Sequence, residues 1–269
     1  MTSVPVGARR RRLQGQLSAP LPSSPDLVLV TDLDGTLLEG PMPGRQRLYG
    51  WLRSRREQVL HVFCTGRDLG SVSRLLRQEP RLGLGAPHLV IGDVGCTVAC
   101  GASLQLVPLA VDPIERRWRG LQQRLEPLLR GQPGLSAEPI SVDRHLAYDY
   151  DPESFDHGLV PRLEAEGVDC LHSGGRYFDV LPGGVNKGST LLELLGWLEL
   201  DPRQVVTAGD SLNDLAMFQT GLPGIMVGNA EPALRLHLPR LPATFPAVGH
   251  GCDCIVEGLH HFGFAHLFD

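Results

Sequence analysis

The chain has 269 residues, of which 42% are hydrophobic and 20% charged, and its formal net charge at pH 7 is -5. This composition is typical of a folded globular protein, and the negative charge gives no electrostatic reason to expect a nucleic acid partner. The chain contains no run of about 18 apolar residues, so no membrane-spanning helix is predicted. The length accommodates one large domain, or a core together with a smaller second domain.

The first 25 residues differ in composition from the rest. Arg9 to Arg12 form a basic run, and the segment also contains four prolines, Pro5, Pro20, Pro22 and Pro25. No apolar stretch follows the arginines, so the segment does not have the pattern of a secretory signal. We expect residues 1–25 to form a disordered tail that is dispensable for activity.

Short apolar runs then alternate with amphipathic patterns. The runs lack a period of two, which indicates strands buried on both faces of a parallel sheet, and they span residues 27–30, 59–64, 89–91, 205–208 and 225–227. Between them, apolar residues recur at helical spacing in residues 45–57, 69–78, 187–200 and 213–220. This order predicts a doubly wound, Rossmann-like α/β core formed by residues 26–111 and 182–269.

Residues 112–181 have a different order of elements. We expect a helix, two strands, a second helix and two further strands, at residues 114–126, 135–140, 145–150, 152–167, 168–172 and 176–180. Pro127 is expected to end the first helix, and Pro161 to kink or divide the second. Ser173-Gly174-Gly175 suits a hairpin loop between the last two strands. This αββαββ pattern predicts a small α/β domain inserted into the core.

Six cysteines are scattered along the chain: Cys64, Cys96, Cys100, Cys170, Cys252 and Cys254. A disulfide framework is typical of short secreted proteins, so we expect reduced thiols and a cytoplasmic location. Cys252 and Cys254 form one close pair, but no second close pair completes a zinc site.

The strongest chemical signal is an acid pair directly after the first apolar run. Asp32 and Asp34 lie in Asp-Leu-Asp-Gly-Thr, where Gly35 allows the chain to turn sharply. Ligands of open α/β sheets bind beyond the carboxyl ends of the strands, so both carboxylates are expected at one site. Such a pair suits a hard cation and a reacting phosphate, with the first acid as nucleophile and the second as proton carrier. The alternative is an Asp-Gly turn with a capping aspartate.

Three further groups follow in chain order, and two of them also come just after expected strands. Thr65 and Gly66 follow the second run, where a hydroxyl and a backbone N–H can hold phosphate oxygens, although a turn or helix cap has the same pattern. Lys187 begins a helix and can offset phosphate charge, although most lysines at such a position are solvated surface residues.

A second acid pair, Asp210 and Asp214, follows the fourth run, with Asn213 beside it. Asp210 can bind a cation and Asp214 can orient the site from behind, whereas helix capping is the alternative. Chance agreement of all four groups in this order is much less probable than any single alternative. We therefore interpret them as one site.

Together these motifs resemble those of haloacid dehalogenase superfamily phosphatases with a type IIB cap. Asp32 to Thr36 resembles the first motif, Thr65 to Arg67 the second, Lys187 the third, and Gly209 to Asp214 the fourth. Finer features resemble the sucrose-phosphate phosphatase branch, namely Gly92-Asp93-Val94-Gly95, Phe178-Asp179-Val180-Leu181-Pro182, Ile225-Met226-Val227-Gly228-Asn229-Ala230, and Glu257-Gly258-Leu259 through Phe264. The resemblance implies that residues 112–181 are the cap.

The resemblance also implies roles for individual residues. Asp32 would attack phosphorus, and Asp34 would protonate the leaving sugar oxygen and then activate water. Mg²⁺ would bind Asp32, the Asp34 backbone carbonyl and Asp210, with Asp214 behind them. The expected phosphate ligands are Thr65, Gly66, Lys187 and Asn213.

The expected reaction is hydrolysis of a sugar phosphate such as sucrose 6-phosphate, without a nucleic acid or membrane partner. Candidate sugar contacts in the cap are Arg144, His145, Tyr148, His172 and Tyr177. The alternatives are a broad sugar or nucleotide phosphatase, a mannosylfructose-phosphate or mannosyl-phosphoglycerate phosphatase, and a non-enzymatic carbohydrate-binding protein. The sequence does not indicate the oligomeric state.

Overall fold

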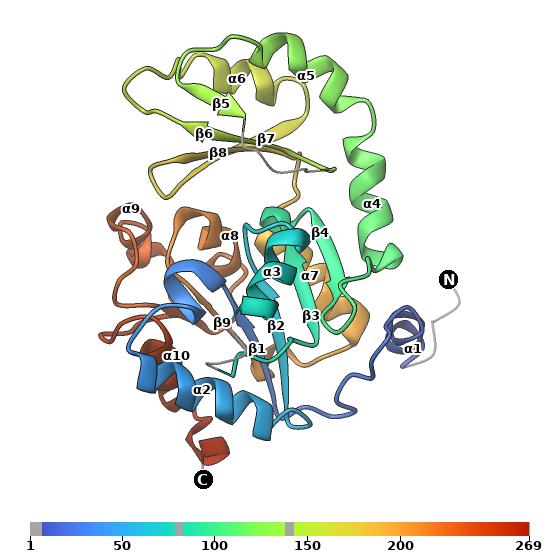
Figure 1. The fold of residues 1–269 in the computed structure, drawn as a ribbon, viewed down its shortest axis with the longest axis vertical. Helices are drawn as coiled ribbons and strands as arrows, with labels where there is room; N and C mark the ends of the chain where they lie inside the picture. The colour runs from blue at the N-terminus through green and yellow to red at the C-terminus, as the bar shows by residue number, and fades with distance from the viewer. Residues whose placement is uncertain (1–6, 79–82, 138–142, 269) are drawn as a thin grey trace.

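The computed structural model describes residues 7–78, 83–137 and 143–268. It contains two sheets, and the smaller lies across the upper end of the larger in the view of Figure 1. The larger sheet has the strand order β11-β10-β9-β1-β2-β3-β4, and the smaller has the order β5-β6-β8-β7. The α/β core with an inserted α/β domain is therefore confirmed. Among the described helices, none is both long and apolar enough to cross a membrane.

The large sheet is parallel except at one edge, where β4 runs antiparallel to β3. Its strands are β1 (Leu27–Thr31), β2 (Val59–Cys64), β3 (Leu89–Gly92), β4 (Thr97–Cys100), β9 (Val205–Gly209), β10 (Gly224–Met226) and β11 (Thr244–Pro246). The five predicted runs are all strands of this sheet. The short edge strands β4 and β11 were not predicted.

Helices cover both faces of this sheet, as its unalternating apolar strands require. Along β1, Leu27 and Leu29 face one apolar cluster, whereas Val28 and Val30 face the other. The first cluster includes residues of α2 (Met42–Ser54), α3 (Leu69–Gln78), α9 (Pro232–Arg235) and α10 (Cys252–His261). The second includes residues of α1 (Ala8–Gln14), α4 (Pro108–Trp118) and α7 (Lys187–Leu198). The four-residue helix α8 (Leu215–Phe218) contributes to both clusters.

The prediction of a disordered tail is wrong for the described part of the first 25 residues. Residues 8–14 form helix α1, and the side chain of Leu13 is fully buried against the core. Leu17 and Leu21 pack against the same cluster. Leu13 in the helix and Leu17 and Leu21 after it provide the apolar contacts that hold the segment against the core.

The inserted domain is a four-stranded antiparallel sheet with helices on one face. It comprises α5 (Leu121–Leu129), β5 (Leu135–Ala137), β6 (Leu146–Tyr150), α6 (Leu159–Glu164), β7 (Val168–Ser173) and β8 (Tyr177–Pro182). Residues 138–140 of the first predicted strand lie outside the described residues. Helix α4 leads from the large sheet toward this domain, so the boundary that we predicted at residue 111 falls inside α4 (Figure 1).

The predicted bounds of two cap helices are wrong. The first is two helices, α4 and α5, that separate at Gly120, whose φ of 79° is readily adopted by glycine. Pro127 lies inside α5 rather than after it, where burial of the apolar face of α5 offsets the missing hydrogen bond. The second helix begins only at Leu159, so Pro161 occupies its first turn, where no N–H donor is needed.

Candidate active site

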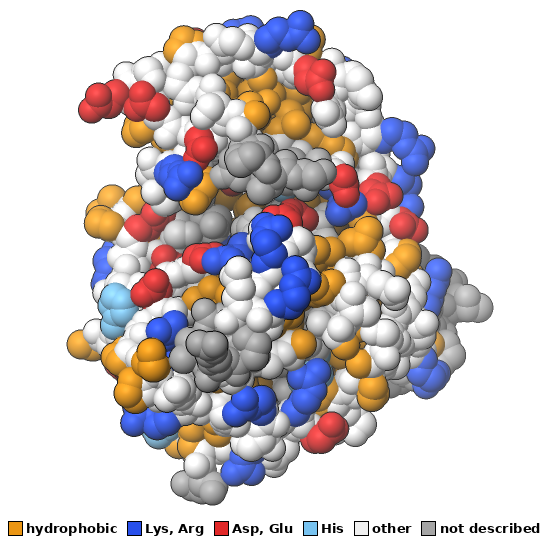
Figure 2. All heavy atoms as spheres, in the orientation of Figure 1, with side chains coloured by type: hydrophobic (Ala, Val, Ile, Leu, Met, Phe, Trp, Pro, Cys, Tyr) orange, Lys and Arg blue, Asp and Glu red, His pale blue; other side chains and the backbone are white. Residues whose placement is uncertain are grey.

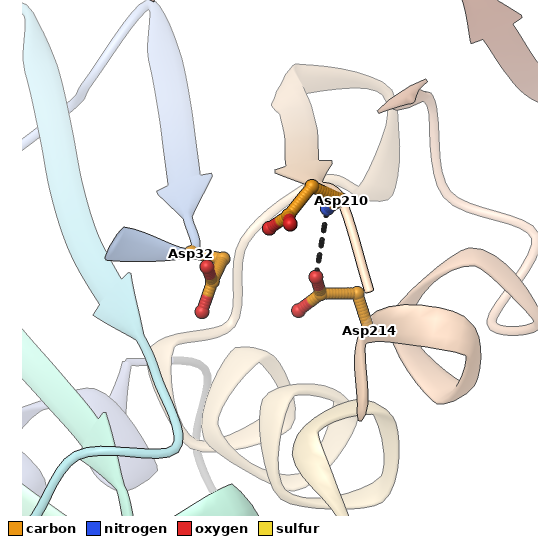
Figure 3. Close-up of side chains that lie close together, drawn as sticks. All are labelled: Asp32, Asp210 and Asp214. Carbon is orange, nitrogen blue, oxygen red and sulfur yellow. Dashed lines mark hydrogen bonds between the residues drawn. The ribbon is translucent and has the colours of Figure 1, made fainter. Parts of the chain in front are cut away.

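Two carboxylates meet where two adjacent parallel strands end. Asp32 follows β1 directly, and Asp210 follows β9. The backbone N–H of Asp32 donates to the carbonyl of Ala208 in β9 at 2.9 Å, so the two strand ends lie side by side. Oxygen atoms of Asp32, Asp210 and Asp214 all lie within 4.8 Å of one another. Figure 3 shows the three side chains converging from different segments of the chain. The structure thus brings together three of the four residues that we predicted to hold the metal.

Lys187 lies between two of these acids. It begins α7, which is capped by reciprocal side-chain bonds of Asn186 and Ser189, and its side chain is fully buried. The Lys187 Nζ atom donates to Asp32 Oδ1 at 2.7 Å and to Asp214 Oδ1 at 2.6 Å. Burial alone would lower the pKa of Lys187, but the two carboxylates outweigh it and raise that pKa. Lys187 therefore remains a cation at the back of the site.

Asp214 also orders the loop that carries Asp210. Its Oδ2 atom accepts hydrogen bonds from the backbone N–H groups of Asp210 at 2.9 Å and Ser211 at 3.1 Å. With Oδ1 bonded to Lys187, both oxygens of this fully buried carboxylate have partners. Asp214 therefore positions its neighbours rather than facing the open pocket.

The cluster holds more negative than positive charge. Burial and the neighbouring Asp214 raise the pKa of Asp210 to about 7. Burial also raises the pKa of Asp32, while Lys187 acts in the opposite direction. A group of oxygen donors with excess negative charge is the environment that Mg²⁺ prefers. The side chains of Asp32 and Asp210 therefore fit a magnesium site, with Asp214 supporting it from behind.

Residues that we did not predict hold this arrangement in shape. Thr36 Oγ1 donates to Asp210 Oδ1 at 3.0 Å, and Asn229 Nδ2 donates to the Gly35 carbonyl at 2.6 Å. Gly35 has a φ of 76°, and a Cβ atom there would lie only 2.2 Å from Asp210 Oδ2. Only glycine allows Asp210 to pack against this backbone. Thr36 lies in the first phosphatase motif and Asn229 in a motif of the sucrose-phosphate phosphatase branch, so the sequence marked both residues without showing their contacts.

The Asp34 side chain lies apart from the three clustered carboxylates. Arg67 binds it through two parallel hydrogen bonds, Nε to Oδ2 at 2.6 Å and Nη2 to Oδ1 at 2.5 Å. The bond to Asp34 raises the pKa of Arg67. Bidentate pairing is the strongest form of arginine–carboxylate contact. Sequence reasoning placed Arg67 in a motif but did not predict this partner.

The four predicted phosphate ligands differ in how they reach the pocket. Gly66 and Asn213 line it, whereas Thr65 and Lys187 are buried behind its wall. The Thr65 hydroxyl accepts the backbone N–H of Arg67 at 3.1 Å and so shapes the turn. The Asn213 Oδ1 atom is buried without a hydrogen-bond partner in the described part of the chain. Phosphate oxygens are acceptors, so Asn213 would hold them through its Nδ2 hydrogens.

The pocket lies between the large sheet and the cap, and its volume is about 350 Å³. Acidic and basic side chains also gather where the cap meets the core on the surface in Figure 2. The core side presents Asp32, Asp34 and Asp210, whereas the cap side presents His145, Ala147, Ser173, Gly174, Tyr177 and Asp179. Charged groups for the chemistry and polar groups of the cap therefore face the same space.

Only two of the five predicted sugar contacts line this pocket, His145 and Tyr177. Tyr148 packs with the apolar cluster of the cap, and the ring of His172 lies 4.8 Å from that of Phe178 in the same cluster. Successive residues of a strand face opposite sides of the sheet, so both side chains point away from the pocket. Arg144 bonds to the core instead.

His145 is held neutral at the cap side of the pocket. Burial, and secondarily the charge of Arg144, lower the pKa of His145 to about 4. Its Nε2 atom lies 3.6 Å from Asp179 Oδ1, and its Nδ1 atom is buried without a hydrogen-bond partner among the described residues.

Comparisons with known proteins show what the chain is similar to. The chain is 38% identical over 239 residues to a glucosylglycerol-phosphate synthase of Pseudomonas anguilliseptica, covering 88% of this chain but only 31% of the relative. It is 28% identical to a mannosylfructose-phosphate phosphatase of Agrobacterium fabrum, covering 88% of this chain and 96% of that one. It spans about three fifths of the length of the plant relatives that it matches.

A solved structure of the sucrose-phosphatase from Synechocystis sp. PCC6803, in complex with sucrose and phosphate, superposes with a TM-score of 0.79 at 27% identity. The match covers 88% of this chain and 98% of that structure. The family model described as sucrose-6F-phosphate phosphohydrolase matches residues 25–263. The chain therefore belongs to the sucrose-6F-phosphate phosphohydrolase family, a branch of the haloacid dehalogenase superfamily phosphatases.

Proposed function

We propose that this chain is a phosphatase that hydrolyses the phosphate monoester of a glycosyl compound through a phosphorylated Asp32. The observation that carries the proposal is the position of Asp32. Its carboxylate ends β1 at the floor of the pocket, bonds to the buried Lys187, and lies beside Asp210. A carboxylate nucleophile needs an anchored orientation and nearby positive charge, and this geometry supports both.

Each residue has a defined part in the proposed reaction. An Asp32 oxygen bonds to phosphorus while the bond from phosphorus to the leaving sugar oxygen breaks, and Asp34 gives that oxygen a proton. Asp34 then takes a proton from water, the water oxygen bonds to phosphorus, and Asp32 leaves as a carboxylate together with inorganic phosphate. Lys187 orients Asp32 and offsets charge throughout.

Arg67 must loosen its hold on Asp34 before Asp34 can carry a proton. In the structure, both Asp34 oxygens accept hydrogen bonds from the guanidinium, so Asp34 must turn away from Arg67 to reach a substrate. Asp34 is 61% exposed at its side chain, so it has room to rotate toward a bound substrate. This supports the assignment of Asp34 as proton carrier rather than metal ligand through its side chain.

Magnesium fits the same site. Asp32 and Asp210 would hold it through carboxylate oxygens, together with the backbone carbonyl of Asp34, and Asp214 would orient them. When bound, the ion would offset the negative charge of the phosphate and of the clustered acids.

The cap favours a substrate larger than phosphate alone. The pocket extends from the acids to polar cap groups that can pair with hydroxyls, including His145 and Ser173. A disaccharide phosphate such as sucrose 6-phosphate is our first candidate, supported by the family model and by the sucrose-phosphatase of similar fold. Mannosylfructose phosphate is a related alternative, supported by the Agrobacterium relative.

Glucosylglycerol phosphate is a second candidate, favoured by a specific observation. The relative whose name contains this compound shares 38% identity with the chain, whereas the mannosylfructose-phosphate phosphatase shares 28%. Both candidates are glycosides that carry one phosphate monoester, so one phosphate site serves either compound. The groups on the cap side of the pocket would then distinguish them.

A substrate panel tests the proposal. Phosphate release is measured with Mg²⁺ for sucrose 6-phosphate, glucosylglycerol phosphate, mannosylfructose phosphate, a nucleoside monophosphate and p-nitrophenyl phosphate. We expect one glycosyl phosphate to exceed the aryl phosphate in kcat/KM by at least about 100-fold, because unpaired buried polar groups penalise a substrate without hydroxyls. Equal values would favour a broad phosphatase, and no release would favour a non-enzymatic carbohydrate-binding protein.

A further inference from the structure

Arg144 connects the cap to the core. It precedes β6 of the cap sheet, and only 6% of the residue is exposed. Its Nε atom donates to the Cys96 carbonyl at 3.0 Å, and its Nη2 atom donates to Thr97 Oγ1 at 2.8 Å. Cys96 directly precedes the core edge strand β4, and Thr97 is the first residue of that strand. One cap side chain is thus bonded to the core at two points.

A third bond includes the helix that leads into the cap. The Nη1 atom of Arg144 donates to Glu115 Oε1 at 3.2 Å, and Glu115 is part of α4. The guanidinium therefore holds three elements together: the start of β6, the edge strand β4 and the connecting helix α4. The planar fork of arginine suits such a junction, because its donors point in fixed directions.

The linkage continues toward the phosphate site. The Thr97 hydroxyl accepts a hydrogen bond from Arg144 and donates one to Asp93 Oδ2. A hydroxyl can act as acceptor and donor at the same time. Asp93 begins a turn of three residues with positive φ, Asp93 at 52°, Val94 at 53° and Gly95 at 105°. A branched residue such as Val94 rarely adopts this conformation, so its surroundings must hold it there.

Val94 in turn forms part of the reaction pocket. Its side chain lines that pocket, and its backbone N–H donates to the carbonyl of Thr65 at 3.2 Å. Gly95 has no room for a side chain, since a Cβ atom would lie 2.3 Å from the backbone of Asn186, next to Lys187. The turn is therefore wedged between the two segments that carry predicted phosphate ligands.

Arg144 also supplies charge to a buried acid that the proposed reaction does not use. Asp93 is 7% exposed, and its Oδ1 atom has no hydrogen-bond partner among the described residues. Burial raises the pKa of Asp93 to about 6, whereas the Thr97 hydroxyl and the charge of Arg144 act to lower it. Loss of the guanidinium would leave this acid without its nearby cation.

We propose that Arg144 is a positioning residue, not a sugar ligand: through Thr97 and Asp93 it fixes the cap on the strained turn at Val94. The neighbouring residue His145 lines the pocket, so the same contact sets where the cap polar groups lie above the phosphate. The proposal rests on the proposed function, because it assumes a glycosyl phosphate that contacts both cap and core.

The first test compares two cap arginines. Arg144→Met removes the guanidinium but keeps an apolar stem of similar length. Arg124→Met is the matched control, because Arg124 pairs with Glu166 inside the cap at 3.4 Å and neither residue lines the pocket. We expect Arg144→Met to lower kcat/KM for the best glycosyl phosphate by roughly 10-fold to 100-fold, mainly through KM, because misplacement by about 1 Å has effects of this size. Hydrolysis of p-nitrophenyl phosphate by Arg144→Met should change less than about 2-fold, and so should hydrolysis of either substrate by Arg124→Met, because surface substitutions have effects of this size.

The hydroxyl of Thr97 provides a second, independent variant. Thr97→Val removes the hydroxyl that links Arg144 to Asp93 while keeping the side-chain shape, so it should reproduce the KM increase. Thr97→Ser keeps the hydroxyl and should retain the native kinetics. The double variant Arg144→Met with Thr97→Val should be no worse than Arg144→Met alone, because both changes break one linkage. Additive losses, or equal losses on glycosyl and aryl phosphates, would overturn the positioning role.

A measurement without substrate separates this proposal from the proposed function. Hydrogen–deuterium exchange should be faster in Arg144→Met than in the native chain at the start of β6 and in β4, and unchanged in Arg124→Met. Unchanged exchange in both variants would refute the linkage whatever the substrate is. Faster exchange in a protein that releases no phosphate from any glycosyl compound would support the linkage and refute the proposed function.

Discussion

The two walls of the pocket are built differently. On the core wall, charged groups are buried and bonded to one another: Lys187 is fully buried between Asp32 and Asp214. On the cap wall, single side chains from β6, β7 and β8 face the pocket, and the buried His145 is kept neutral. The core wall therefore provides a bonded cluster of charges for chemistry, whereas the cap wall provides single polar side chains suited to recognition, together with Asp179 beside His145.

This difference also determines how each wall tolerates change. Removal of one partner from a buried ion pair leaves an uncompensated charge, so the core wall acts as a unit. Cap residues such as Ser173 and Tyr177 lie on separate strands and are not joined by such a network in the contacts described above. Substitutions on the core wall should therefore affect all substrates alike, and those on the cap wall should affect substrates selectively.

The largest expected effect is the loss of the nucleophile. Asp32→Asn should lower kcat by at least about 10³-fold for both a glycosyl and an aryl phosphate, because the amide cannot form the phosphorylated intermediate. The change is nearly isosteric, and Lys187 keeps its bond to Asp214. Phosphate release is measured alongside thermal unfolding to show that the variant is folded. Substantial turnover by the folded variant, or a loss restricted to one substrate, would contradict the role of the core wall.

The next effect concerns metal binding by the same wall. Asp210→Asn should weaken Mg²⁺ binding by roughly 10-fold or more, because it removes a charged donor from the cluster. Asp34→Asn is the matched control: it should retain Mg²⁺ affinity while losing activity, since its proposed metal contact is the backbone carbonyl. Titration calorimetry with MgCl₂ measures both affinities.

Without metal, Asp210→Asn should not lower the thermal unfolding temperature. Burial and the neighbouring Asp214 raise the pKa of Asp210 to about 7, because both disfavour its charged form in the folded chain. Mg²⁺ affinity equal to that of the native chain, or activity that survives complete chelation, would exclude the proposed metal site.

The core wall could be largely predicted from sequence. Strand ends of a parallel sheet meet at one edge, so Asp32 and Asp210 are brought together by topology alone. What could not be predicted is which atoms pair. The bidentate bond from Arg67 to Asp34 and the bond from Thr36 to Asp210 depend on side-chain torsions, which no spacing rule specifies.

The cap wall was predicted less well because the direction of each side chain depends on strand register. A shift of one residue moves every side chain to the other face, so Tyr148 and Ala147 exchange roles. The structure places Ala147 in the pocket and Tyr148 in the cap interior. Likewise, the buried Leu13 was missed because it follows a basic run, although Leu17 and Leu21 continue its spacing.

The N-terminal segment provides a third prediction, on stability rather than chemistry. It precedes the family match, which begins at residue 25, yet Gln16 Oε1 accepts the backbone N–H of Leu109 at the base of α4 at 2.9 Å. Leu13→Ala should lower the free energy of unfolding by roughly 3 kcal/mol, because it opens a cavity in the core. Urea unfolding measures this change.

Kinetics separate the two possible contributions of this segment. Leu17→Ala is the matched control and should cost less, because Leu17 is only partly buried. A chain that begins at Pro25 should be less stable but keep its kcat at low temperature. A large loss of kcat in the folded, shortened chain would show that the segment belongs to the catalytic machinery.

The smallest expected effect is on the pH dependence of folding stability, and it concerns two buried histidines of the core. Burial, together with neighbouring charges, lowers the pKa of His61 to about 3 and of His88 to about 4, from an ordinary value of 6.5. His61 forms hydrogen bonds through both its backbone and its ring. Its backbone N–H donates to His88 Nδ1 at 3.0 Å, and its Nε2 atom lies 3.0 Å from Thr31 Oγ1. Both imidazoles are therefore neutral in the folded chain at pH 5.

Between pH 6.5 and about 4 the unfolded chain binds a proton on each ring and the folded chain does not, so stability must fall as the pH is lowered through this window. At pH 5 the expected loss is about 2 kcal/mol for each histidine. His61→Gln should be less stable than the native chain at pH 7 but should lose less between pH 7 and pH 5. The exposed His260→Gln should keep the native dependence, and an unchanged pH dependence in His61→Gln would show that His61 is not the neutral buried group that its contacts indicate.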